Sequence, residues 1–205
     1  MIFAKNTRSE TLYYTRMSRE FKQIQILLRE KGRPETIDFV NKVVPGEQKV
    51  YGVKTPELNS IVNQFKSGSF DIAEELWTSG ALEEKVIAIK IVEKMGKHDP
   101  SRLLRLFRQF AKGIDNWAVC DGLGMQFLRP IVKTHKKDIF SLADKYNQSK
   151  DFWQRRLSLV MVEWYTREKA SHPAIVRLVK NLENDKEYYV KKAVAWIRRN
   201  MAKGK

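Results

Sequence analysis

Apolar side chains recur at intervals of three and four residues through most of this chain, and that spacing limits its fold more than any other feature. Residues spaced in this way lie along one face of an α-helix. The alternation of apolar and polar residues that marks a half-buried strand between hairpin turns is absent. The sequence therefore predicts an all-α protein.

Glycine and proline residues divide the chain into segments of helical length, roughly ten to twelve in number. Asp99-Pro100 is a typical helix opening, with a capping side chain before a proline in the first turn. Four segments have the length of a helix pair in HEAT or armadillo repeats: 71–96, 99–133, 136–168 and 171–203. We predict one domain over residues 1–205, a short curved α-solenoid of HEAT-like repeats with a concave basic groove.

Cysteine content and hydropathy indicate where such a chain works. Cys120 is the single cysteine, so no intrachain disulfide can form, and a reducing intracellular compartment is the natural setting. The first ten residues lack the apolar core of a signal peptide, and no stretch approaches the ~20 apolar residues of a membrane span. We expect a soluble cytoplasmic protein with no membrane partner.

Charge points to a polyanionic partner. The chain has 39 Lys and Arg residues against 24 Asp and Glu residues, a net charge of +15. This excess favours nucleic acid over a membrane surface, with a merely soluble basic protein as the alternative. The cations recur at several places along the chain, including Arg155–Arg156, Lys191–Lys192 and Arg198–Arg199, which predicts a distributed basic surface.

The stretch DNWAVCD, residues 115–121, places Trp117 and Asp121 four residues apart, on one face of a helix. The plainest interpretation is a helix start, with Asp115 or Asn116 as N-cap, Trp117 in the core and Asp121 solvated. Helical spacing favours another arrangement, in which two stripes lie well apart. The predicted core stripe is Val119, Cys120, Leu123, Phe127 and Ile131. The other stripe, predicted to lie off the core, is Trp117, Asp121, Gly124 and Leu128.

The same spacing singles out charged and aromatic residues in two later segments. In the segment after Asp151, Arg155 is predicted to be solvated, and Arg156 to be partly buried and aimed by packing. In the last helix Trp196 lies off the apolar stripe, near Lys192 and Arg199. A tryptophan among cations suits a groove lining, although packing against a neighbouring helix explains it nearly as well.

Five stretches together resemble the DNA alkylation repair family of HEAT-like-repeat DNA glycosylases, the AlkD-like proteins. They are YGVKTPEL (51–58), LWTSGALEEKVIAIKIVEK (76–94), IDNWAVCD (114–121), FWQRRLSLV (152–160) and YYVKKAVAWIRR (188–199). The resemblance runs from about the first of these stretches to the C-terminal helix. Their order and spacing carry it more than any one motif.

The resemblance implies a glycosylase of base-excision repair that releases 3-methyladenine and 7-methylguanine from duplex DNA, without a metal or organic cofactor. Asp121 matches the family's catalytic carboxylate, Trp117 and Trp196 its cleft tryptophans, and Arg156 its cleft arginine, expected to grip a backbone phosphate. The family also places a cleft aromatic upstream of GVKTPE. Tyr51 is the aromatic available there.

Lys192 and Arg199 complete the set of predicted DNA-binding residues. We expect a monomer that associates with the nucleoid when it is bound to DNA. Two other functions stay open: a non-excising relative that recognises damaged or branched DNA, and a HEAT-like scaffold for a protein partner.

Three further features bear on the site. Gly122 and Gly124 follow Asp121, and they either make room for a substrate or kink the helix and displace the carboxylate. The acidic pair Glu83–Glu84 is expected to be solvated, with pairing to cations of a neighbouring repeat as the alternative. The isolated histidines show no metal-ligand spacing with Cys120.

Overall fold

The computed structural model describes residues 17–46, 48–65 and 68–203, and all regular secondary structure in these ranges is helical. The all-α prediction is therefore confirmed. The α-helices are α2 (Arg19–Lys31), α3 (Pro34–Val43), α4 (Thr55–Gln64), α5 (Phe70–Ser79), α6 (Leu82–Met95), α7 (Pro100–Phe110), α8 (Trp117–Asp121), α9 (Lys136–Asn147), α10 (Phe152–Val160), α11 (His172–Asn181) and α12 (Tyr188–Lys203).

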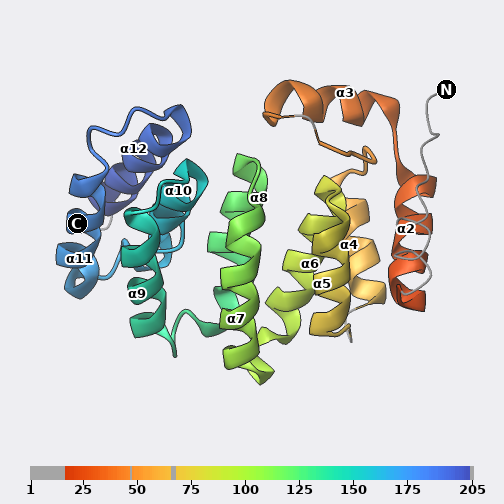
Figure 1. Ribbon diagram of the computed structural model, residues 1–205, viewed down its shortest axis with the longest axis horizontal. Helices are drawn as coiled ribbons and strands as arrows, with labels where there is room; N and C mark the ends of the chain where they lie inside the picture. The colour runs from red at the N-terminus through yellow and green to blue at the C-terminus, as the bar shows by residue number, and fades with distance from the viewer. Residues whose placement is uncertain (1–16, 47, 66–67, 204–205) are drawn as a thin grey trace.

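The helices stand side by side in a row, with α2 at one end and α11 and α12 at the other (Figure 1). Helix α5 packs on α6, α9 on α10, and α11 on α12, which confirms the predicted pairs 71–96, 136–168 and 171–203. Helix α3 departs from this pattern because it lies across one edge of the row (Figure 1) and has no buried residue. The arrangement is consistent with the predicted α-solenoid. No helix in the described ranges is both long and apolar enough to cross a bilayer.

Polar side chains cap α7 and α8 at positions that the sequence indicates. Asp99 Oδ1 accepts a hydrogen bond from the backbone N–H of Arg102, at 2.9 Å, and opens α7. Asn116 Oδ1 does the same for the N–H of Val119, at 2.9 Å, and opens α8. Of the two predicted caps for α8, Asn116 is therefore the one that the structure uses.

A continuous apolar core runs through the described helices. Near its middle the Trp77 and Phe110 rings stack with centroids 4.2 Å apart. The predicted core stripe is confirmed, because each of its members is at most 1% exposed: Val119, Cys120, Leu123, Phe127 and Ile131.

After Asp121 the helix widens into one π-helical stretch, Gly122–Phe127. The wider turn changes the direction of the side chains that follow. Gly124 and Leu128, predicted to lie off the core, are consequently buried. A Cβ on Gly124 would lie 2.5 Å from Val160 Cγ1 and 3.0 Å from the backbone nitrogen of Met161. Gly124 thus makes room for α10, and not for a substrate.

The acidic pair at the start of α6 is buried, which corrects the expectation of solvation. The residues Glu83 and Glu84 are 3% and 1% exposed. The Glu83 carboxylate accepts hydrogen bonds from three successive backbone N–H groups, those of Tyr51, Gly52 and Val53, at 3.0, 2.7 and 3.2 Å. A charged side chain at this position anchors the segment that leads from α3 into α4.

Candidate functional site

Trp117, Asp121 and Trp196 line a single pocket of about 350 Å³. Helix α8 supplies Trp117 and Asp121 from successive turns, and α12 brings Trp196 from far along the chain. The other walls are mainly apolar and come from α6, α8 and the π-helical stretch: Val86, Ile89, Ala118, Gly122, Met125 and Gln126. A carboxylate therefore faces a pocket with two indoles and aliphatic walls.

Hydrogen bonds fix the N-terminal end of α8, where the pocket begins. The indole Nε1 of Trp117 donates to the carbonyl oxygen of Val43, at 2.9 Å, which ties its ring to the end of α3. The Asn116 amide donates to Gln48 Oε1, also at 2.9 Å. The Lys85 ammonium donates to Asp115 Oδ2, at 2.5 Å. Trp117 is thereby oriented by segments on both sides of it.

Asp121 is held by Arg156 of α10 in a two-pronged ion pair. Arg156 Nε donates to Asp121 Oδ1 at 3.0 Å, and Nη2 donates to Oδ2 at 2.9 Å. A third bond runs from Nη1 to the carbonyl oxygen of Tyr189 at 2.7 Å, which connects the pair to α12. The Arg156 side chain is 8% exposed and that of Asp121 31% exposed, so only the carboxylate is open toward the pocket.

The burial predicted for Arg156 is therefore confirmed, and its main partner is the carboxylate. The planar fork that the sequence assigned to a phosphate is occupied by Asp121 in this structure. A phosphate contact stays a prediction. Glycine at position 124 lets α10 pack closely against the π-helical stretch. Asp121 of α8 and Arg156 of α10 consequently lie within hydrogen-bonding distance.

Burial and the arginine act on Asp121 in opposite directions. Burial raises the pKa of the Asp121 carboxyl above its ordinary value, and the hydrogen bonds and positive charge of Arg156 oppose that rise. Burial also raises the pKa of the neighbouring Cys120 thiol well above its ordinary value. Burial therefore favours the neutral thiol form of Cys120.

Lys192 and Arg199 are exposed on α12. They lie four residues before and three residues after Trp196, so all three share one face of that helix. Lys192 Nζ sits 5.3 Å from the centroid of the Tyr188 ring. These two cations therefore lie beside the pocket wall that Trp196 forms. Their contact with DNA stays a prediction.

Two predicted placements differ from the structure. Tyr51 is not brought to this pocket: it lines a separate cavity, where its hydroxyl donates to Glu84 Oε1 at 2.7 Å. Arg155 is not freely solvated, because its Nε donates to Asp185 Oδ2 at 2.6 Å, within a side-chain pair that is 19% and 7% exposed. Helical spacing could not predict Asp185 as the partner of Arg155, because Asp185 lies in the loop between α11 and α12.

Sequence reasoning missed the pocket residues Val86, Ile89, Met125 and Gln126. Val86 and Ile89 lie on α6, whose apolar residues cover most of its circumference, so spacing does not separate a pocket face from a core face. Met125 and Gln126 lie in the π-helical stretch, where a count of 100° per residue fails.

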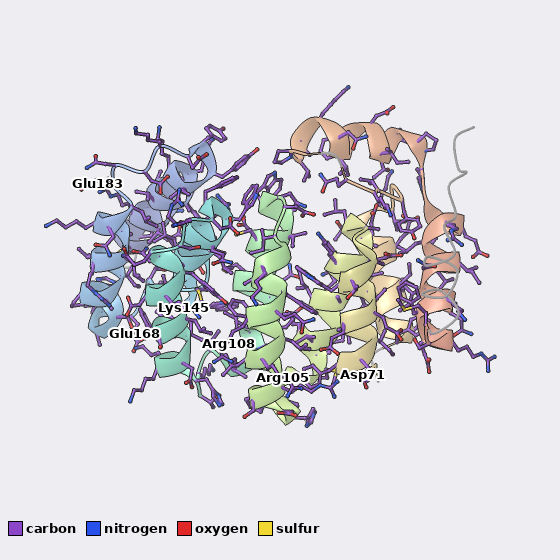
Figure 2. The ribbon with its side chains drawn as sticks, viewed as in Figure 1. Asp71, Arg105, Arg108, Lys145, Glu168 and Glu183 are labelled. Atoms are coloured by element: carbon purple, nitrogen blue, oxygen red, sulfur yellow. The ribbon has the colours of Figure 1, made fainter. Side chains whose placement is uncertain are left out.

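Positive charge is spread over several helices, as predicted. Figure 2 shows Arg105 and Arg108 of α7 and Lys145 of α9 on a face that also carries Asp71, Glu168 and Glu183. These three acids pair with Arg102, Lys136 and Arg198, respectively. Acidic residues are therefore interspersed with the cations on this face.

Comparison with known proteins identifies the relatives of this chain. A family model described as DNA alkylation repair enzyme matches residues 24–205. The chain belongs to this family. Family membership gives it a role in the repair of alkylation damage as an enzyme, with DNA as substrate or partner.

One solved structure of the same fold is described as a predicted DNA alkylation repair enzyme from Enterococcus faecalis. The match covers 85% of this chain and 84% of that chain, with a TM-score of 0.73 and 16% sequence identity. No curated protein matches the sequence. The structural likeness agrees with the family assignment at the level of the fold.

Proposed function

We propose that this family member is a DNA glycosylase that excises cationic N-alkylated purines, 3-methyladenine and 7-methylguanine, from duplex DNA. The observation that carries the proposal is the placement of Asp121. Its carboxylate is fixed by Arg156 and opens into the pocket that Trp117 and Trp196 line. An anion between aromatic faces is complementary to a cationic substrate.

The chemistry of these lesions needs little acid catalysis. An N-alkylated purine already carries a positive charge, so it leaves as a neutral base when the bond from the sugar carbon to the base nitrogen breaks and the base keeps both electrons. Positive charge then develops on the sugar, as an oxocarbenium ion. A carboxylate that is already oriented stabilises this charge without first reorganising.

Asp121 has a second task in the same reaction. Water adds to the sugar carbon and loses a proton, and a carboxylate at this position can orient the water and accept that proton. The products are the free methylated base and an abasic sugar. Arg156 acts as a positioning residue, because its two bonds fix the direction of the carboxylate.

The tryptophans act on the base. The face of an indole attracts a cation by about 0.5–2 kcal/mol per contact, and a neutral purine gains less. Trp117 is held for this purpose by its bond to Val43, and Trp196 by its place on α12. Together they favour alkylated over unmodified purines.

The test is the release of 7-methylguanine and 3-methyladenine from methylated duplex DNA by the wild type and by Asp121→Asn. The substitution removes the charge and is expected to lower the single-turnover rate by about 100-fold or more. Asp138→Asn makes the same chemical change at an exposed position of α9 and serves as the matched control.

DNA binding is measured in parallel by fluorescence anisotropy, so that rates are compared at equal occupancy. If the wild type binds duplex DNA and releases neither base, the protein is a non-excising member that recognises DNA damage. If Asp121→Asn keeps the wild-type rate, Asp121 is not the catalytic carboxylate.

A further inference from the structure

A second cavity, of about 590 Å³, lies where α2, the first turn of α3 and the turn between α5 and α6 meet. It shares no lining residue with the pocket of Asp121. Its volume is within the range of about 300–1,000 Å³ that is usual for small-molecule sites. Figure 1 shows α2 at one end of the row, with α3 leading from it across one edge. The proposed glycosylase chemistry assigns no role to this cavity.

The floor of the cavity is polar and rich in acceptors. The Glu84 carboxylate, in a residue that is 1% exposed, accepts bonds from Gln25 and Tyr51 at Oε1, at 2.9 and 2.7 Å, and from the Ser79 hydroxyl at Oε2. Each carboxylate oxygen can accept two bonds, so Oε2 keeps one place. The carbonyl oxygen of the Gln25 amide accepts no hydrogen bond within the described part of the chain. A ligand with N–H donors fits this floor.

The rim of the cavity is cationic. Arg29 and Lys49 are exposed, and neither has an acidic partner among the described residues. Arg33 is also at the rim but pairs with Glu57 at 2.7 Å. Two exposed cations without acidic partners among the described residues favour an anion such as phosphate.

The walls between rim and floor are largely apolar, from Pro34, Ile37, Val50 and Ala81. The order of these parts fixes how a ligand would lie. An anion would be repelled by the Glu84 carboxylate at the floor and attracted at the rim, whereas N–H donors are favoured at the floor. A ligand with a phosphate at one end and an amino-bearing heterocycle at the other satisfies both ends.

We propose that this cavity binds a single nucleotide unit, with the exocyclic amino group of its base at Glu84 and its phosphate at Arg29 and Lys49. The nucleotide is either a free mononucleotide or an unpaired nucleotide of DNA, because both present the same groups. The site is separate from the one that carries the proposed excision chemistry, and its occupancy is measured without any base release.

Isothermal titration of the full chain with dCMP, dAMP, dGMP, dTMP and inorganic phosphate tests the free form. The three amino-bearing nucleotides should bind more tightly than dTMP and phosphate. Arg29→Ala combined with Lys49→Ala should raise the Kd of dCMP by about tenfold or more, because two charged contacts are lost. Lys22→Ala combined with Lys180→Ala removes two exposed cations elsewhere and is the matched control.

The second arm compares a duplex carrying one extrahelical deoxycytidine with the same duplex fully paired. A preference for the extrahelical nucleotide that the rim variant abolishes, and the control variant keeps, assigns the site to DNA. Ser79→Ala removes the hydroxyl that donates to Glu84 Oε2, and so alters the floor of the cavity without changing any charge. The proposal is overturned if nucleotides bind no better than phosphate, or if the rim variant changes binding in neither arm.

Discussion

Asp121 and Glu83 are both carboxylates withdrawn from water, and the groups that hold them differ. Glu83 accepts hydrogen bonds from three backbone N–H groups and is buried. Asp121 is bound on one side by the Arg156 guanidinium and is open on the other side to the pocket with Trp117 and Trp196. The first arrangement fixes the course of the chain, whereas the second leaves a charge available to a substrate.

The energetics of the two arrangements differ as well. A carboxylate that accepts several backbone N–H bonds satisfies groups that would otherwise be buried without partners, so it contributes directly to the fold. A largely buried ion pair gains much less, because desolvation of both charges offsets their attraction. The Asp121–Arg156 pair is therefore better explained by what it does at the pocket than by stability.

Gly124→Ala should have the largest effect on excision, because it pushes α10, which carries Arg156, away from the π-helical stretch that follows Asp121. The new methyl would lie 2.5 Å from Val160 Cγ1, and moving α10 away costs about 1–3 kcal/mol. A carboxylate displaced by even about 1 Å can cost about 100-fold in rate. Urea unfolding and single-turnover excision measure the two effects.

Gly122→Ala is the control for this substitution. Its methyl would lie 3.0 Å from Ile89 Cδ1, the end of a side chain that can move, so the stability loss should be smaller. If both alanine variants lose the same free energy of unfolding, the contact between the π-helical stretch and α10 has no specific role.

Arg156→Met should have the next largest effect and should depend on pH. Arg156 opposes the rise that burial causes in the Asp121 pKa, so its removal raises that pKa further. The carboxylate must be ionised to stabilise a cation, and activity is lost as the pH falls through its pKa. The acid limb of kcat/KM should therefore move to higher pH in the variant.

At neutral pH the expected loss for Arg156→Met is about tenfold or more, the usual scale for a charged hydrogen bond. Raising the pH should restore part of the activity. A uniform loss with an unchanged pH profile would instead indicate that Arg156 acts on DNA directly, through the phosphate contact predicted from the sequence.

Glu83→Gln should have the smallest effect on excision. The amide cannot accept all three backbone N–H bonds, so the free energy of unfolding should fall by about 1–3 kcal/mol. Because the Asp121 pocket does not include Glu83, kcat/KM below the unfolding transition should be unchanged. A loss of excision without a loss of stability would remove the distinction between the two carboxylates.

Much of the fold was predictable from local rules. Helical spacing identified the core stripe from Val119 to Ile131, and capping chemistry identified Asp99 and narrowed the cap of α8 to Asp115 or Asn116, because these features depend on residues within one or two turns. Helical spacing misplaced Leu128, which follows the π-helical stretch and is buried. That widening accompanies close packing against α10, a partner that spacing within one segment cannot reveal.

The sequence by itself determined the helical class, the likeness to alkylation repair proteins, and the position of Trp117 and Asp121 on a face away from the core stripe. Tertiary structure alone decided that Trp196 joins them, that Arg156 grips Asp121, and that Tyr51 lies in another cavity. The physical reason is the distance along the chain over which each kind of interaction acts. Periodicity and capping act over a few residues, whereas the ion pair and the pocket join side chains from helices far apart in the chain.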